Sequence, residues 1–284
     1  MKSIAYLSIL FLSLGYFYGC TSDDVPNEPL PEVPLKAKEL LNISYGADSD
    51  QAYDLYLPAE RTEGTKILIL VHGGGWTSGD KTDMTGFKDF LRAELPDIAV
   101  VNMNYRLADE NNLPYPMQTN DITSVVNNLR ENREEYQIGS DLGFVGISAG
   151  GHLSLLWSYA LDTDKKVKMV CSVVGPTNLL DGVYQNSDNE ILQGLVQQFG
   201  SNNEILEQAS PLLQVDASAP PSILFYGGLD PLVPISQGID LDGKLTELEV
   251  EHQFTLYANE GHGWIGENLF DTSIKLKAFI EKHL

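Results

Sequence analysis

The sequence predicts an α/β protein with a mostly parallel sheet of about eight strands and helices on both faces. Continuous aliphatic runs, such as residues 66–71, are typical of strands that are buried on both faces. Helical segments separate most of these runs, and strands that alternate with helices form parallel sheets. The first two strands, at residues 42–45 and 52–57, differ because residues 53–57 alternate in polarity, as in a half-exposed antiparallel pair.

The other elements follow in chain order. Residues 121–134 predict a helix because Ile122, Val125, Val126 and Leu129 recur at helical spacing. We expect further strands at residues 98–103, 167–174, 223–226 and 253–257, another that ends at Phe144 and Val145, and further helices at 84–94, 152–161 and 274–283. Residues 176–215 interrupt the alternation, and they predict either a small lid over the site or an ordinary connecting helix with long loops.

Charge and cysteine content exclude several classes of function. The 284 residues include 18 basic and 40 acidic side chains, for a formal charge of −22. A nucleic-acid partner is therefore not expected, since phosphate binding needs a basic face. The two cysteines, Cys20 and Cys171, form no disulfide framework, and Cys171 is expected in a buried strand. No Cys/His cluster has metal-ligand spacing, so we expect neither a metal nor a cofactor.

The first residues predict export. Lys2 precedes an apolar run at residues 4–17, which is the layout of a signal peptide, here residues 1–19. Cys20 resembles the acylated cysteine of bacterial lipoproteins, although Phe17 and Tyr18 depart from that motif. An ordinary signal peptide with a chance cysteine is the alternative. Residues 20–38 contain four prolines and predict a tether, followed by the folded domain at 39–284. The expected location is the bacterial cell envelope, on the periplasmic or outer surface, with membrane contact only through the lipid anchor.

Residues 146–150, Gly-Ile-Ser-Ala-Gly, carry the main candidate for a nucleophile. The pattern G-x-S-x-G between a buried strand and a helix exposes a serine, here Ser148, at the apex of a sharp turn. Gly146 and Gly150 are expected where neighbouring backbone leaves no room for a Cβ atom. A serine hydroxyl needs a nearby base to act as a nucleophile.

The base and its orienting acid should follow strands, because sites collect at the carboxyl ends of the strands of an α/β sheet. Of the five histidines, His262 lies in the loop directly after the last strand, whereas His152 is expected to pack behind the site. Asp230 follows the strand at 223–226, whereas its rival Asp216 precedes that strand. We therefore predict Ser148, Asp230 and His262 as the catalytic residues.

The oxyanion of an ester-cleavage intermediate needs preorganised N–H donors. The backbone N–H of Ala149 follows the nucleophile. Gly73, Gly74 and Gly75 allow a second loop to approach with its amides pointing inward. Three glycines alone are equally consistent with a phosphate cradle or a plain turn, but the P-loop pattern is absent here.

Five motifs in this order resemble α/β-hydrolases of the hormone-sensitive-lipase-like type and related bacterial esterases, including feruloyl and acetylxylan esterase-like proteins. They are His-Gly-Gly-Gly-Trp at 72–76, Asn-Tyr-Arg-Leu-Ala at 104–108, and the segments 146–150, 228–234 and 261–263. The resemblance covers residues 45–284 and implies the α/β-hydrolase fold. It further implies that Gly74, Gly75 and Ala149 donate to the oxyanion, and that Arg106 and Asp121 support the site. Asp109 departs from the family, which usually has proline there.

The resemblance and the order of the candidate residues predict a serine carboxylesterase. We expect it to hydrolyse short-acyl or aromatic-acyl esters, either of small molecules or linked to plant polysaccharide, through an acyl-enzyme on Ser148. Two alternatives remain open at this point. One is a non-catalytic, glycan-binding surface lipoprotein on a hydrolase scaffold, and the other is a lipase- or arylformamidase-type hydrolase.

Overall fold

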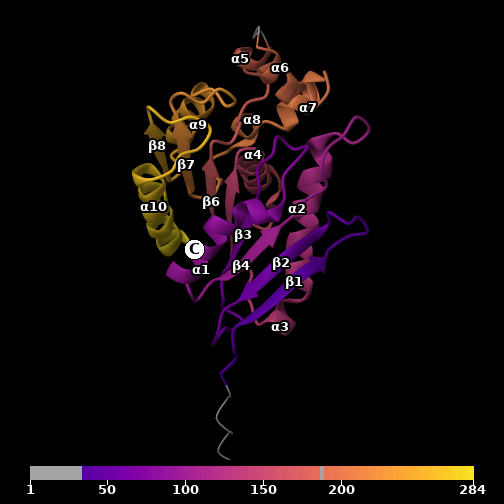
Figure 1. Ribbon diagram of the computed structural model, residues 1–284, viewed down its shortest axis with the longest axis vertical. Coiled ribbons are helices and arrows are strands. Elements are labelled where there is room, and N and C mark those ends of the chain that lie inside the picture. The colour runs from indigo at the N-terminus through magenta and orange to yellow at the C-terminus, as the bar shows by residue number, and fades with distance from the viewer. Residues whose placement is uncertain (1–33, 186–188) are drawn as a thin grey trace, which may run out of the picture. The chain divides into compact units, whose positions relative to one another are not determined.

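An eight-stranded sheet forms the centre of the structure, with the strands in the spatial order β1-β2-β4-β3-β5-β6-β7-β8 (Figure 1). β2 pairs antiparallel with both β1 and β4, and the other neighbouring strands pair in parallel. The predicted fold class is thus confirmed. The strands are β1 (Lys38–Ser44), β2 (Ala52–Leu57), β3 (Ile67–Val71), β4 (Ala99–Met103), β5 (Leu142–Ile147), β6 (Val167–Val173), β7 (Ser222–Gly227) and β8 (His252–Tyr257).

The computed structural model describes residues 34–185 and 189–284, and Pro34–Leu284 is one compact unit. The expected signal peptide, Cys20 and the first part of the tether lie outside the described residues and stay predictions. Within the described residues, no helix is both long and apolar enough to span a bilayer.

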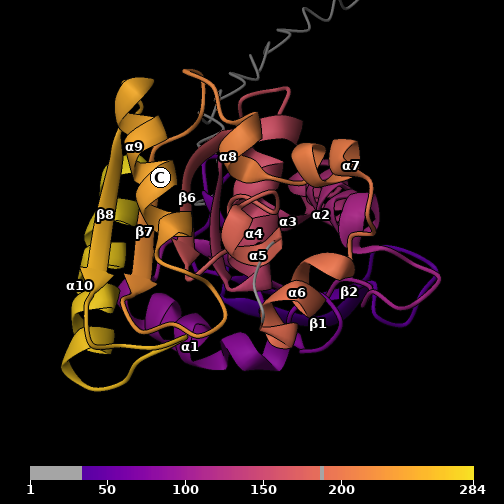
Figure 2. The same cartoon turned by 90° about the horizontal axis from the view of Figure 1, so that it is seen from above.

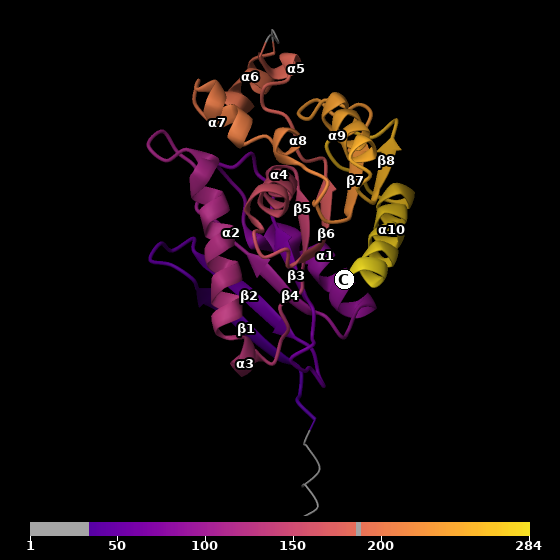
Figure 3. The ribbon, with the colours of Figure 1, turned by 180° about the vertical axis from the view of Figure 1, so that it is seen from behind.

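Helices cover both faces of the sheet. α1 (Thr85–Glu94) and α10 (Glu267–His283) pack on one face, over a core that includes Leu91, Leu276 and Phe279 (Figure 1). α2 (Pro114–Glu131), α4 (Ala149–Leu156) and α9 (Ser236–Glu247) pack on the other face, where Figure 3 shows α2 and α4 from the front. This second core is the larger of the two and includes Ile122, Val125 and Leu129, as the periodicity of that segment predicts.

Between β6 and β7 the described residues form four short helices: α5 (Gly182–Gln185), α6 (Glu190–Gln197), α7 (Asn203–Gln208) and α8 (Pro211–Gln214). They lie together beyond one end of the sheet in Figure 1, and Figure 2 shows them from above. The remaining short elements are η1 (Lys81–Met84), α3 (Arg133–Tyr136) and the π-helical turn η2 (Trp157–Leu161).

Several predicted boundaries were wrong. α2 begins at Pro114 instead of residue 121, since proline suits the first turn of a helix. α10 begins at Glu267 instead of residue 274. The helix predicted at 152–161 begins at Ala149 and changes to π geometry at Trp157. α9 was not predicted at all.

The register of the parallel strands brings the candidate loops together. Val71, the last residue of β3, pairs with Gly146 near the end of β5. Ile147 pairs with Val173 of β6, and Gly227 of β7 pairs with Tyr257 of β8. The glycine loop, the Ser148 turn, the Asp230 loop and the His262 loop therefore all leave the same edge of the sheet.

Candidate active site

Ser148 lies in a tight turn between β5 and α4, in a backbone conformation of φ +53° and ψ −121°. Its N–H donates to the carbonyl oxygen of Val173 at 2.8 Å, which fixes the turn to β6. A Cβ atom on Gly146 would lie 2.2 Å from the carbonyl oxygen of Gly150, and one on Gly150 would lie 2.1 Å from that of Val71. Both glycines are thus required by close backbone contacts, as the sequence predicts.

The structure brings together the three predicted catalytic side chains. His262 Nδ1 lies 2.7 Å from Asp230 Oδ2, and His262 Nε2 lies 2.8 Å from Ser148 Oγ. A carboxylate only accepts hydrogen bonds, so Nδ1–H donates to Asp230, and the unprotonated Nε2 accepts the Ser148 hydroxyl proton. This is the tautomer that a general base needs.

Asp230 is held firmly in place for its contact with the imidazole. Its side chain is 1% exposed, and its Oδ1 accepts the N–H groups of Leu232 and Val233 at 2.8 and 3.0 Å. Its Oδ2 is left for His262, whose side chain is 24% exposed. Asp216 plays no such part, because its Oδ1 accepts from the N–H and hydroxyl of Ser218 in an exposed turn.

The glycine loop presents unpaired N–H groups beside Ser148. Within the described residues, the N–H groups of Gly74 and Gly75 have no acceptor. Gly74 has φ +105°, and a Cβ atom there would lie 2.0 Å from the carbonyl oxygen of Ser78. Ala149 is the first residue of α4, and the first N–H groups of a helix have no intrahelical partner. The three predicted oxyanion donors are therefore free to bind a ligand oxygen.

Side chains behind the glycine loop hold it rigidly. The Tyr105 hydroxyl lies 2.9 Å from the carbonyl oxygen of His72 and 3.1 Å from that of Gly73. Trp76 Nε1–H donates to His152 Nδ1 at 3.1 Å, and His152 Nε2 contacts the carbonyl oxygen of Ala209 at 2.7 Å. The sequence pointed to Tyr105 only as part of a motif, and its contact with the loop was not predicted.

His152 is a neutral packing residue, as predicted. Burial lowers its pKa to about 4. Its Nδ1 accepts a hydrogen bond from Trp76, which a protonated nitrogen cannot do. The other histidines lie elsewhere: His72 is buried against the ring of Tyr105, His252 contacts Asp242, and His283 contacts Glu251.

Arg106 and Asp121 form a buttress beside the site. Asp121 is fully buried, and its Oδ1 accepts from Arg106 Nη2 at 2.6 Å and from Gln51 Nε2 at 2.9 Å. The Arg106 N–H also donates to Asp121 Oδ2 at 2.9 Å. This pair joins the loop after β4 to α2. Asp109, the departure from the family pattern, accepts four hydrogen bonds within its own exposed turn at residues 109–112.

A cavity of about 420 Å³ opens above Ser148 and His262. The glycine loop forms one wall, and Leu232 and Val233, which follow Asp230 in the chain, form another. Pro176 and Leu195 of the segment 176–215 also line it, so this segment covers part of the site. Within the described residues, no group of His, Cys, Asp and Glu side chains is placed to hold a metal ion.

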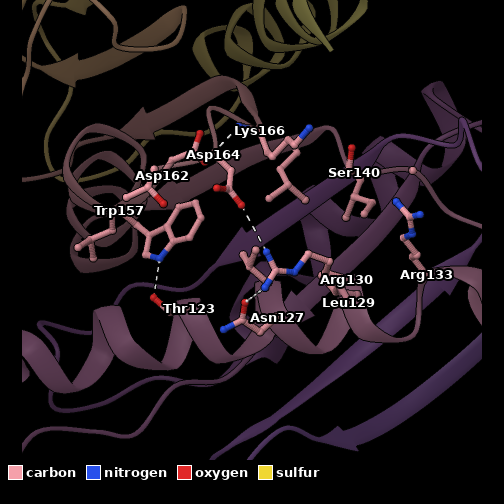
Figure 4. A pocket seen from close by; sticks show the side chains of 16 residues that line it. Thr123, Asn127, Leu129, Arg130, Arg133, Ser140, Trp157, Asp162, Asp164 and Lys166 are labelled. Atoms are coloured by element: carbon pink, nitrogen blue, oxygen red, sulfur yellow. Dashed lines mark hydrogen bonds and ion pairs between the residues drawn. The ribbon is translucent and has the colours of Figure 1, made fainter.

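A separate cavity of about 360 Å³ lies at the opposite edge of the sheet, near the first residues of β3 and β5 (Figure 4). Trp157 Nε1–H donates to Thr123 Oγ1 at 2.9 Å, and Arg130 contacts Asp164 at 3.3 Å. None of the three predicted catalytic side chains lines this cavity, so it is not the candidate active site.

Residues 53–245 match the sequence model of the family described as BD-FAE. The chain belongs to the BD-FAE family. Among curated relatives, Esterase LipC of Mycobacterium tuberculosis is 26% identical over 214 residues, covering 69% of this chain and 52% of LipC. Carboxylesterase NlhH of the same species is 30% identical over 134 residues, covering 45% of this chain and 39% of NlhH. This BD-FAE chain thus spans about half of LipC and less of NlhH.

Solved structures agree with the fold. A truncated carbohydrate esterase from gut microbiota superposes with a TM-score of 0.72 at 20% identity, covering 86% of this chain and 96% of that one. An acetyl ester-xyloside bifunctional hydrolase from Caldicellulosiruptor lactoaceticus superposes with a TM-score of 0.68 at 16% identity, covering 87% and 97%. This BD-FAE member therefore has the α/β-hydrolase fold.

Proposed function

We propose that this protein is a serine carboxylesterase that cleaves esters through an acyl-enzyme on Ser148. The observation that carries the proposal is the hydrogen-bonded series Asp230–His262–Ser148, with separations of 2.7 and 2.8 Å. It opens into a cavity beside three N–H groups that have no acceptor among the described residues. Nucleophile, base, orienting acid and oxyanion donors are the complete set that acyl transfer requires.

The arrangement accounts for each step of hydrolysis. Ser148 Oγ attacks the ester carbonyl carbon while His262 Nε2 takes the hydroxyl proton. The N–H groups of Gly74, Gly75 and Ala149 stabilise the negative charge on the carbonyl oxygen. His262 then gives its proton to the departing alkoxide, so the alcohol leaves and the acyl group stays on Ser148. Water, activated by the same imidazole, releases the acid and restores the serine.

The substrate class that we propose is a short-acyl or aromatic-acyl ester on plant polysaccharide. The cavity above Ser148 is walled by apolar side chains, among them Leu195, Leu232 and Val233, and no lysine or arginine of the described residues lines it. Such a wall suits an uncharged acyl group. Two solved structures with this fold, a carbohydrate esterase and an acetyl ester-xyloside bifunctional hydrolase, support the same substrate class.

The test uses the Ser148→Ala variant. We expect the wild-type protein to hydrolyse p-nitrophenyl acetate or methyl ferulate, and the variant to lose at least ~10⁴-fold in kcat because no other nucleophile replaces the hydroxyl. A fluorophosphonate probe should label the wild-type protein and leave the variant unlabelled. Ser124→Ala, the same chemical change on α2 away from the site, is the matched control and should keep full activity.

Hydrolysis that persists in Ser148→Ala would contradict the proposal. A folded wild-type protein that cleaves no ester but binds xylan would instead indicate a glycan-binding protein. Preference for p-nitrophenyl octanoate would indicate a lipase, and cleavage of N-formyl amides in place of esters would indicate an arylformamidase.

A further inference from the structure

A second cavity, of about 660 Å³, adjoins the one above Ser148. It lies between α1 and the first turns of α10, and we call it the aromatic groove. Asp83 and Ile147 line both cavities, and Ile147 directly precedes the nucleophile in the chain. A molecule whose reactive carbonyl lies at Ser148 can therefore extend into the aromatic groove without leaving the protein surface.

The aromatic groove lies on the histidine side of the site. Its wall is built by residues that follow His262, namely Trp264 and Gly266, and by Leu269 and Phe270 of α10. Under the proposed function, His262 Nε2 hands its proton to the leaving alcohol, so that alcohol must lie next to His262. The aromatic groove is thus placed for the alcohol part of an ester, whereas the cavity beside Leu195 and Val233 is placed for the acyl part.

Four aromatic side chains line this groove: Phe87, Phe90, Trp264 and Phe270. Trp264 is fixed, because its Nε1–H donates to Thr272 Oγ1 at 2.9 Å and its ring lies 4.8 Å from that of Tyr257. Phe270 is 69% exposed, and the neighbouring Ile265 is 84% exposed. Clustered exposed apolar side chains of this kind mark a binding surface more often than a folding requirement.

The polar lining indicates what kind of alcohol fits. Asp83 uses Oδ2 to accept the Asp80 N–H at 3.0 Å, and within the described residues its Oδ1 has no partner. A free carboxylate oxygen accepts hydrogen bonds from hydroxyl groups and repels anions. In the part of the chain that the structure describes, no lysine or arginine lines the groove, and the whole protein carries a formal charge of −22. An anionic occupant is therefore excluded, and the lining suits hydroxyl groups beside an apolar face.

We propose that the aromatic groove binds the sugar ring of an acylated saccharide, as the alcohol part of the substrate. A sugar ring presents C–H groups on its faces and hydroxyl groups at its edge, which match Phe270 and Trp264 on one hand and Asp83 on the other. This inference rests on the proposed function, which sets the orientation of the bound ester. To that function it adds the subsite and the residue, Phe270, that select the alcohol.

The test compares Phe270→Ala with wild type on two acetate esters, an acetylated xylo-oligosaccharide and ethyl acetate. The ratio of kcat/KM for the oligosaccharide to that for ethyl acetate should fall about five- to tenfold, since an aromatic contact is lost only for the larger alcohol. Ile239→Ala, a similar truncation of a half-exposed side chain on α9, is the matched control and should leave the ratio unchanged.

A binding measurement separates failure of this inference from failure of the proposed function. The acetylated xylo-oligosaccharide is titrated into Ser148→Ala and into the double variant Ser148→Ala, Phe270→Ala, and calorimetry measures the binding in each case. Weaker binding in the double variant supports the groove even if the wild-type protein cleaves no ester. Equal binding, or no binding at millimolar concentration, overturns the groove assignment even if the protein is an active esterase.

Two further outcomes would assign the groove to another occupant. If Phe270→Ala changes selectivity between methyl acetate and methyl ferulate, and not between alcohols, the groove binds the acyl group. If sedimentation shows a dimer that Phe270→Ala dissociates while the alcohol selectivity stays constant, a second copy of the chain covers the surface. Either result contradicts the proposal.

Discussion

The backbone at Ser148 is strained. A side chain at φ +53° and ψ −121° lies in a region that residues other than glycine rarely occupy, at a cost of about 1–3 kcal/mol. The surrounding structure enforces this conformation: the Ser148 N–H is held by Val173, and its carbonyl oxygen accepts the His152 N–H at 3.0 Å. The strain directs Oγ toward His262 Nε2, so it serves the hydrogen bond on which the proposed chemistry depends.

Replacing the side chain should release this strain. Ser148→Gly should have a free energy of unfolding about 1 kcal/mol higher than Ser148→Ala, because both lose the hydroxyl but only glycine adopts the turn freely. Urea denaturation at pH 7 measures the difference, and both variants should be inactive. Equal stability of the two variants would show that the turn is unstrained.

At the scale of the element, α6 decides how deep the acyl cavity is. Leu195 lines the cavity above Ser148, and its Cδ2 would lie 3.6 Å from a Cβ atom on Gly75. α6 therefore closes the cavity beside Gly75, one of the proposed oxyanion donors. For residues 176–215, the sequence left open a small lid over the site or an ordinary connecting helix with long loops. The contact of Leu195 with the cavity favours a cover over the site.

Leu195→Ala should widen the range of acyl chains. Removing the isobutyl group leaves room for extra methylene groups, each worth about 0.8 kcal/mol when buried. We expect the ratio of kcat/KM for p-nitrophenyl octanoate to that for the acetate to rise about tenfold. Ile191→Ala, on the same helix but 62% exposed and outside the cavity, is the control. An unchanged ratio in Leu195→Ala would place the acyl chain elsewhere.

The elements that the sequence predicts well are those that local pattern determines. Aliphatic runs such as residues 67–71 form buried strands, and the turn at Gly146–Gly150 needs glycine for contacts within one motif. α9 escaped prediction because it contains Gly238 and Gly243, which lower helix propensity. Gly238 is there for a tertiary reason: a Cβ atom would lie 2.6 Å from the Tyr226 ring.

The same distinction holds for the candidate site. Ser148, Asp230 and His262 each follow a strand in a recognisable order, so their meeting was predictable. The aromatic groove was not, since Phe87 and Phe270 lie on helices far apart in the chain and meet only because α1 and α10 pack on one face. Likewise, the contact of Leu195 with the cavity depends on how α6 packs over the site at the end of the sheet.

At the scale of the whole molecule, charge and burial act on stability in opposite directions as the pH falls. The formal charge of −22 and a pI near 4.4 mean that acidification relieves repulsion among surface carboxylates. The core around His152, in contrast, is destabilised as the pH falls. This imidazole is completely buried between α4 and the segment after β6, with ring contacts to Trp76 and Phe199.

Protonation of His152 should oppose folding in mildly acidic solution. Its pKa is about 4 in the folded protein and about 6.5 in an unfolded chain, so the unfolded state binds more protons between these values. Stability from this group is complete above pH 6.5 and is lost as the pH falls toward 4, by about 2 kcal/mol between pH 7 and pH 5. Urea denaturation of the wild-type protein and His152→Gln at both pH values measures it. The glutamine variant, less stable at pH 7, should lose about 2 kcal/mol less on acidification.

Leu153→Ala is the control, because it is a destabilising core change next to His152 that removes no titrating group, and it should keep the wild-type pH dependence of stability. If His152→Gln also keeps the wild-type pH dependence, the imidazole is not the source of the loss.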